Sequence, residues 1–177
     1  MRTLVALAVL IPSIAAADPH GFTGAVAATT GVTRLTANAV TPNTTEMGTG
    51  YTLTLGAFVR HDLAIAGHVN VLFAVGDETL DGAGANVAFG AIAQYWPASW
   101  FSTFAGPGYS VAAYKRRDPM SIDQALGMDG GFTPLAGASF YPYGGWRASL
   151  EAAPLVTSHG LVAFTAGISL GWQYVRR

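Results

Sequence analysis

The sequence predicts an all-β protein, an eight-stranded antiparallel up-and-down barrel that crosses a membrane. Hydrophobic residues make up 51% of the 177 residues but charged residues only 11%, less than half of the roughly 25% of a soluble domain. The apolar residues recur at every second position, which is the period of a strand and not of a helix. Because lipid offers no partner for unpaired backbone groups, strands that span a membrane must close into a barrel.

The first residues have the features of a cleaved secretory signal. Arg2 supplies a positive charge, Leu4 to Ile14 form an apolar stretch, and Ala15 to Ala17 are the small residues that signal peptidase accepts. The apolar stretch is too short to cross about 30 Å of hydrocarbon. We therefore expect residues 1–17 to be a signal peptide and residues 18–177 to form the barrel domain.

Alternation of apolar and other residues marks eight segments, and about 9 to 11 residues suffice for a tilted strand to span the apolar layer. The segments are Phe22 to Thr33, Thr49 to Arg60, Leu63 to Val75, Ala85 to Trp96, Phe101 to Tyr114, Phe132 to Tyr141, Trp146 to Thr157 and Leu161 to Val175. In the seventh, Trp146 and Leu150 fall on one face while Arg147 and Glu151 fall on the other. The third and eighth repeat this pattern, whereas the sixth alternates poorly. One face therefore suits lipid and the other a partly polar interior.

The connections between these segments alternate between long and short. The long ones are Leu35 to Gly48, Gly76 to Gly84 and Lys115 to Gly131, and the short ones are His61-Asp62, Pro97 to Trp100 and Pro142 to Gly145. Outer-membrane barrels have short periplasmic turns and longer outside loops, so we assign the long connections to the outside. Ser158 to Gly160 is a short outer connection, of a length common in hairpins.

Aromatic residues are placed where membrane interfaces would lie, because amphipathic rings favour the headgroup level. A girdle at the periplasmic end is predicted from Trp96, Trp100, Trp146, Trp172 and Tyr174. A second girdle at the other rim is predicted from Tyr51, Phe73, Tyr109, Tyr114, Phe132 and Phe164.

Together these features resemble the small eight-stranded outer-membrane barrel superfamily, the OmpA-like and opacity-protein-like transmembrane domains. The resemblance covers nearly all of Gly21 to Tyr174 and rests on architecture. Its most specific element is Thr165 to Trp172, which looks like the last-strand signal that such proteins present to the assembly machinery. Those strands usually stop at an aromatic residue, whereas Gln173 to Arg177 follow here. The resemblance implies a Gram-negative outer membrane, with its lipid and lipopolysaccharide as partners and the barrel assembly machinery as a partner during biogenesis.

The interior of an eight-stranded barrel is just wide enough for side chains to fill, so no open pore is expected. Glu151 and His68 each lie five residues above their turns, on opposite strands of the ring. We hypothesise that they share the lumen in a polar plug completed by Arg147, Arg60, Asn70 and Gln94. Such groups would satisfy one another and hold the barrel shut; the alternative is a path for protons or ions.

Charged residues of the outer connections suggest weaker hypotheses. Lys115, Arg116 and Arg117 begin the longest outer loop, level with lipopolysaccharide phosphates, which guanidinium groups bind well. This cluster either contacts lipopolysaccharide or is a solvated loop. The spacing of Asp77, Glu78 and Asp81 fits no calcium-loop pattern, so no metal site is predicted.

Composition and geometry limit the function. The net charge of -1 offers no field for nucleic acid, and the lack of cysteine excludes thiol chemistry. Ser158, His159 and Glu151 have the residue types of a hydrolytic triad, but adjacent strand residues point to opposite sides, so no catalytic residue, cofactor or enzyme activity is expected. We expect an integral outer-membrane barrel with a structural or surface-interaction role and an unspecified extracellular partner. The alternatives are a lipid A-modifying enzyme and a soluble periplasmic lipocalin-like barrel.

Overall fold

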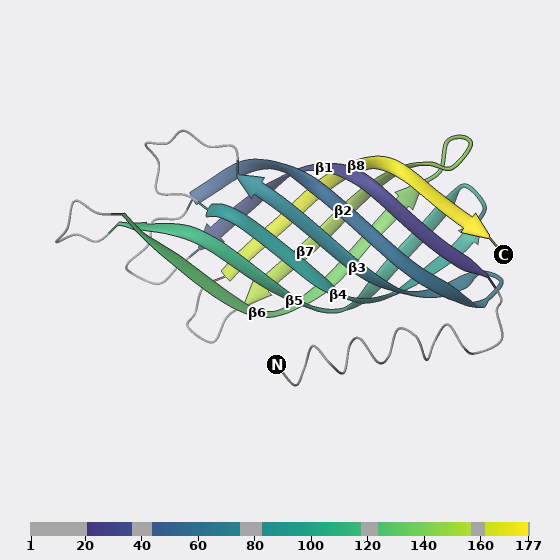
Figure 1. The fold of residues 1–177 in the computed structure, drawn as a ribbon, viewed down its shortest axis with the longest axis horizontal. Coiled ribbons are helices and arrows are strands. Elements are labelled where there is room, and N and C mark those ends of the chain that lie inside the picture. Colours follow the sequence, from purple (N-terminus) through teal and green to yellow (C-terminus); the bar gives the residue numbers. More distant parts are fainter. Residues whose placement is uncertain (1–20, 37–43, 75–82, 118–123, 157–161, 177) are drawn as a thin grey trace.

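The computed structural model describes residues 21–36, 44–74, 83–117, 124–156 and 162–176, which form a closed antiparallel barrel (Figure 1). Each strand pairs with its sequence neighbours, and β8 returns to pair with β1. The strands are β1 (Phe22–Thr36), β2 (Thr44–Arg60), β3 (Leu63–Ala74), β4 (Ala83–Ala98), β5 (Phe101–Arg117), β6 (Gln124–Phe140), β7 (Trp146–Val156) and β8 (Val162–Arg176). The predicted fold class is therefore confirmed. Within the described ranges, no helix is long and apolar enough to cross a membrane.

Side chains alternate between the two faces of the wall, as the pleat of a strand requires. On β8, Ile168 and Leu170 are exposed on the outside, whereas Ser169 and Gln173 are buried in the lumen. The same holds on β7, where Leu150 faces out. The facing predicted from the seventh and eighth segments is thus confirmed.

The outer ends of several strands extend further than the sequence predicted. β1 and β2 stay paired as far as Leu35 and Thr44, and β5 and β6 as far as Arg117 and Gln124. The predicted connections Leu35 to Gly48 and Lys115 to Gly131 were therefore too long. Their limits were set where apolar alternation ended, but ladder hydrogen bonds join backbone groups and do not depend on side-chain polarity.

Turns and strand ends gather at one end of the barrel (Figure 1). The turns after β2, β4 and β6 lie there, and so do the start of β1 and the end of β8, where Phe22 pairs with Arg176. Gly144 and Gly145 in the last of these turns have φ of 56° and 87°, a conformation that favours glycine because it has no Cβ. An even number of strands brings both ends of the barrel to this rim.

The ladder between β6 and β7 covers only part of their lengths. It runs from Phe140 paired with Ala148 to Ala136 paired with Ala152, although both strands continue toward the outer end. Pro134 and Pro154 lie in those continuing parts, and proline has no N–H to donate to a ladder. The Thr133 hydroxyl donates a hydrogen bond to the Pro154 carbonyl instead. In this outer part of the wall the two strands are not paired with each other. We call it the β6–β7 seam, Thr133 to Leu135 and Ala153 to Leu155.

Exposed aromatic side chains form belts toward both rims. At the turn end, Trp146 and Trp172 pack edge to face with ring centroids 6.0 Å apart, and Trp100 packs on Phe140. The described members of the other belt are Tyr51, Phe73, Tyr109, Phe132 and Phe164. On β8 the belts extend from Phe164 to Tyr174, roughly 33 Å of strand, which at a tilt of about 40° spans an apolar band about 25 Å tall.

Trp96 does not belong to the girdle predicted for the turn end. Its side chain is only 4% exposed and faces the lumen, where it packs on Phe58 with centroids 5.0 Å apart. Its neighbour Tyr95 faces outward instead. The prediction took account of height along the barrel but not of facing, which alternates from residue to residue.

Candidate functional site

The centre of the lumen is organised around the Glu151 carboxylate, which β7 directs inward and which is 8% exposed. Its Oε2 atom lies 2.9 Å from Asn70 Nδ2 and 3.3 Å from the Thr52 hydroxyl, both of which donate hydrogen bonds. His68 Nε2 lies 3.5 Å from the same oxygen. One oxygen is thus contacted from β2 and β3, on the far side of the barrel.

The other carboxylate oxygen, Oε1, is contacted from Glu151's own strand and from β8. Arg147 Nη2 lies 3.3 Å away, and the hydroxyls of Ser149 and Ser169 donate at 3.3 and 3.2 Å. Both oxygens therefore have several donors. A buried carboxylate is stable in such a place only when it is paired and hydrogen-bonded, and both conditions hold here.

The cationic partners of Glu151 are held by contacts of their own. Arg147 is 2% exposed, its Nε donates to the Ser139 hydroxyl at 3.0 Å, and its guanidinium carbon lies 5.9 Å from the centre of the Phe104 ring. His68 also packs on Phe104, and its Nδ1 lies 3.0 Å from the Thr54 hydroxyl. Both basic side chains thus pack on the Phe104 ring. We call Glu151, His68, Arg147 and Asn70 the central plug.

Two residues predicted to join this plug lie elsewhere. Gln94 faces the lumen nearer the turns, where it donates to Ser102 and Tyr141. Arg60 is at the end of β2 with its side chain 66% exposed, and its Nε lies 3.4 Å from Asp62. The inclusion of Arg60 was therefore wrong. The pairing of β2 with β3 shifts register between Phe58 and Arg60, so strict alternation, which would turn Arg60 inward, does not hold at the end of the strand.

Hydroxyl residues complete the plug, and sequence reasoning did not single them out. Thr29 joins Thr52 at 2.8 Å and Ser169 at 2.9 Å, which links β1, β2 and β8. A further layer toward the outer end joins Asn86, Ser110 and Thr165. The available signal was position alone: each of these residues lies at an inward position of an alternating strand.

The lumen contains little free space. A cavity of about 20 Å³ lies beside the plug, with Glu151, His68, Asn70 and Asn86 among its lining residues. That volume is enough for about one water molecule, which needs roughly 10–15 Å³ and several polar partners. Apolar side chains close the lumen around the plug: Ala66, Ala88, Ile92, Phe104, Leu135 and Ala153. The arrangement can hold charge in place, and the described side chains leave beside it about the space of one water molecule.

At the turn end the barrel has an open recess of about 340 Å³, with Tyr141, Gln173 and Trp96 in its lining. Gln173 donates to Thr23 and accepts from Tyr141, so a polar network spans the barrel at the base of the recess. Phe58 and Trp96 pack at the same level. The recess therefore ends at a packed layer.

Several predicted residues lie outside the described parts of the chain. They are residues 1–17, Asp77, Glu78, Asp81, Ser158 and His159. The backbone of Lys115, Arg116 and Arg117 is described and pairs with Leu126, Ala125 and Gln124, so these residues belong to β5 and not to a loop. Their side chains are outside the description. Among described residues, no cluster of three or more His, Asp or Glu is suited to a metal ion.

The closed barrel, its outward apolar face and its filled polar lumen give the fold that small eight-stranded outer-membrane barrels have. Solved structures of this class are similar to the chain. Ail, the attachment invasion locus protein of Yersinia pestis, solved with the heparin analogue sucrose octasulfate, has a TM-score of 0.63 and 10% identity over 86% of this chain and 99% of that one. No family model matches the sequence, and neither does any curated protein.

Two further structures have the same fold. Neisserial surface protein A has a TM-score of 0.54 and 11% identity over 85% of this chain and 97% of its own. The N-terminal β-barrel domain of Pseudomonas aeruginosa OprF has a TM-score of 0.53 and 16% identity over 88% and 100%. At these identities the likeness establishes the fold of the chain, and the fold agrees with the resemblance seen in the sequence.

Proposed function

We propose that the protein is an integral barrel of a Gram-negative outer membrane with a structural or surface-interaction role and a lumen closed by side chains. The observation that carries this proposal is the division of side chains between the two faces of the wall. Large apolar residues such as Leu55, Leu150 and Ile168 are about half exposed or more, while Arg147 and Glu151 are buried. In water this distribution would be costly, but in lipid it is favourable.

The same division argues against the soluble lipocalin-like alternative, whose exterior would have to be polar. It also supports a lumen that serves as a core and not as a ligand cavity, since the space beside the plug holds about one water. In this proposal the protein is not an enzyme. Any recognition takes place at the outer end, where Lys115 to Arg117 are the basic residues proposed to contact lipopolysaccharide. The barrel assembly machinery is the proposed partner during biogenesis.

A pair of arginine substitutions tests the membrane placement. Leu55 faces outward from β2, and Tyr143 lies in a turn, 84% exposed. Leu55→Arg should lower the free energy of unfolding by up to about 2–4 kcal/mol, because a lipid-facing charge is costly near the membrane centre. Tyr143→Arg should have little effect. Stability is measured by urea unfolding in lipid vesicles, with folded and boiled samples compared on a gel.

Cell fractionation gives the complementary result. We expect the native chain in the detergent-extracted outer membrane, and we expect it to migrate differently on a gel before and after boiling. Recovery in the soluble periplasm, together with equal stability of Leu55→Arg and Tyr143→Arg, would contradict the proposal.

A further inference from the structure

The lipid-facing wall contains a groove of about 380 Å³ that crosses β1 and β8. Its floor is formed where Gly31 pairs with Gly167 and Val32 with Ala166, so two glycines of adjacent strands lie side by side. Thr30 and Glu151 are also among its lining residues. Larger side chains border it: Met47, Leu150 and Ile168. The hollow exists because its floor consists of backbone and short side chains. Its lining is mostly apolar, so lipid chains can enter it.

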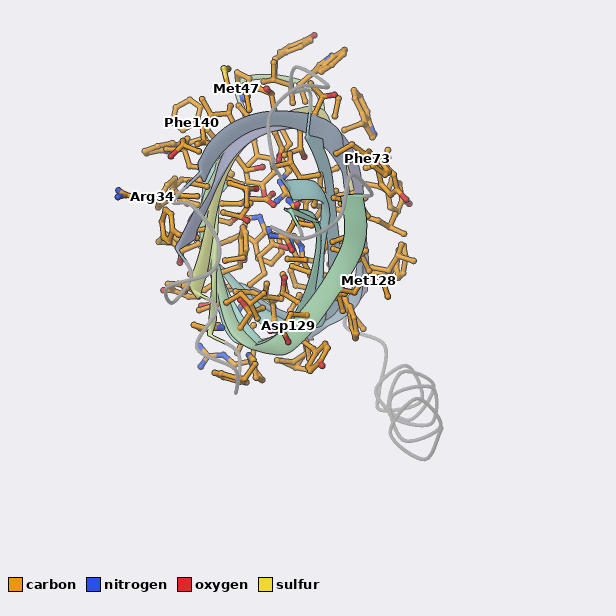
Figure 2. All side chains as sticks on the ribbon, turned by 90° about the vertical axis from the view of Figure 1, so that its left-hand side faces the viewer. Arg34, Met47, Phe73, Met128, Asp129 and Phe140 are labelled. Carbon is orange, nitrogen blue, oxygen red and sulfur yellow. The ribbon has the colours of Figure 1, made fainter. Side chains whose placement is uncertain are left out.

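A cation lies at the outer end of this groove. Arg34 is two residues beyond Val32 on the same face of β1, which is roughly 7 Å along a strand. It pairs with Phe164, a member of the outer aromatic belt, so it is at the level of the lipid headgroups. Figure 2 shows its side chain pointing away from the barrel wall.

Arg34 differs from the other charged side chains that the structure describes. Arg147 and Glu151 are in the lumen, Arg60 and Asp62 are at the turn end, and Asp129 lies at the mouth of the barrel (Figure 2). Among the side chains that the structure describes, none forms a hydrogen bond or ion pair with the Arg34 guanidinium. An arginine at headgroup level favours an anionic partner, and the anions at that level are phosphates.

We propose that Arg34 and the groove together form a binding site for lipopolysaccharide, in which a lipid A phosphate binds the guanidinium and one acyl chain lies in the groove. A guanidinium binds phosphate through two parallel hydrogen bonds. The groove volume is near the lower end of small-ligand pockets, roughly 300–1,000 Å³, so it accommodates one chain and not a whole lipid. Lipopolysaccharide is the occupant because Arg34 is at the end opposite the turns, which faces the outer leaflet in the proposed orientation.

This inference rests on the proposed outer-membrane placement and is independent of Lys115 to Arg117. Two substitutions separate its components. Arg34→Gln replaces the cation with a shorter, neutral polar side chain, and Ala166→Leu fills the groove from the lipid-facing side. Arg60→Gln and Ala105→Leu are the matched controls: Arg60 is an exposed arginine at the opposite rim, and Ala105 is an outward-facing alanine on β5.

The experiment is native mass spectrometry of the purified, folded full chain in detergent, titrated with bisphosphorylated lipid A, dephosphorylated lipid A, phosphatidylglycerol or inorganic phosphate. We expect preferential binding of bisphosphorylated lipid A. Arg34→Gln should weaken it about tenfold or more, as loss of a charge-assisted pair predicts, and should leave binding of dephosphorylated lipid A unchanged. Ala166→Leu should weaken binding of both lipids, and the two controls should bind like the native chain.

The outcomes distinguish this site from the membrane placement itself. Native affinity in Arg34→Gln, or equal binding of the phosphorylated and dephosphorylated lipids, would overturn the site. Equally tight binding of phosphatidylglycerol or of phosphate alone would overturn the assignment to lipopolysaccharide. Each sample is also run unboiled on a gel, and a native chain that lacks the folded band would count against the proposed function and not against this site alone.

Discussion

Glu151 illustrates how a single buried carboxylate is made stable inside the barrel. Its oxygens receive contacts from β2, β3, β7 and β8, among them two basic side chains, His68 and Arg147. Moving such a charge out of water is costly, and the Coulomb attraction of a partner offsets that cost only while the partner is present. The stability of the central plug therefore depends strongly on each basic partner, because removing one leaves the Glu151 charge buried without its full compensation.

Removal of the arginine should test this dependence. Arg147→Met would leave Glu151 with one basic neighbour, and we expect the free energy of unfolding to fall by about 3–5 kcal/mol. Arg60→Met, at the exposed pair with Asp62, should change it by less than about 1 kcal/mol. Urea unfolding in detergent, followed by tryptophan fluorescence, measures both. An Arg147→Met protein as stable as the native chain would show that the ion pair does not hold the lumen together.

Glycine at position 137 makes room for the ring on which both basic side chains pack. A Cβ added there would lie 2.4 Å from Phe104 Cζ and 2.5 Å from the Leu150 carbonyl oxygen. We expect Gly137→Ala to destabilise the barrel by about 1–3 kcal/mol, as overpacking does. At Gly67 an added Cβ would meet only the Leu55 carbonyl oxygen, at 3.9 Å, so Gly67→Ala is the matched control. Thermal unfolding of the two variants compares them, and equal melting temperatures would contradict the packing argument.

The sequence located the plug residues to a limited extent. Strand parity placed His68, Asn70 and Glu151 in the lumen, and their distance from the turns placed them at similar heights. Trp96 was misplaced because height and facing are independent. The serine and threonine donors were not singled out, since such residues occur equally often in turns and on surfaces and acquire their role only when several strands bring them together.

At the level of elements, the β6–β7 seam is the place where the wall has fewest hydrogen bonds. Its strands continue without a ladder beyond Ala136 and Ala152, and Ala136 and Ala152 also line the small cavity beside the plug. Unpaired backbone groups in lipid are costly, so this part of the wall should open more readily than the rest.

Hydrogen exchange should reveal this difference. We expect the amide of Phe132 to exchange faster than those of Ala138 and Phe140 on the same strand, because alternate amides of β6 point toward β7 and only the latter two lie opposite paired residues there. Replacement of Pro134 and Pro154 by valine would add two N–H donors and should slow exchange in the seam. Mass spectrometry of peptides from the folded protein measures both effects. Uniform exchange along β6 in the native chain would contradict this prediction.

Strand limits were the part of the fold that the sequence predicted least well. Alternation defined the membrane-spanning parts, and the starts of β1, β3, β5 and β7 were predicted correctly. The outer ends of β1, β2, β5 and β6 were missed because pairing continues where residues become polar. The incomplete β6–β7 ladder was missed as well, since a proline in one segment does not reveal what faces it on the next.

At the level of the whole molecule, the filled lumen predicts an electrically silent protein. We expect no discrete current steps when the purified barrel is inserted in a planar bilayer, and we expect the same after Glu151→Gln. The reason is that packed side chains surround the plug and the cavity beside it holds about one water. Reproducible unitary currents in the native protein that change in Glu151→Gln would instead support a path for ions or protons through the plug.

The even number of strands has a practical consequence for experiments on living cells. Because β1 starts and β8 ends at the rim that carries the turns, an epitope placed directly before β1 or after β8 should remain hidden from antibodies added to intact bacteria. A label meant to be seen from the medium has to be inserted in one of the connections that follow β1, β3, β5 or β7.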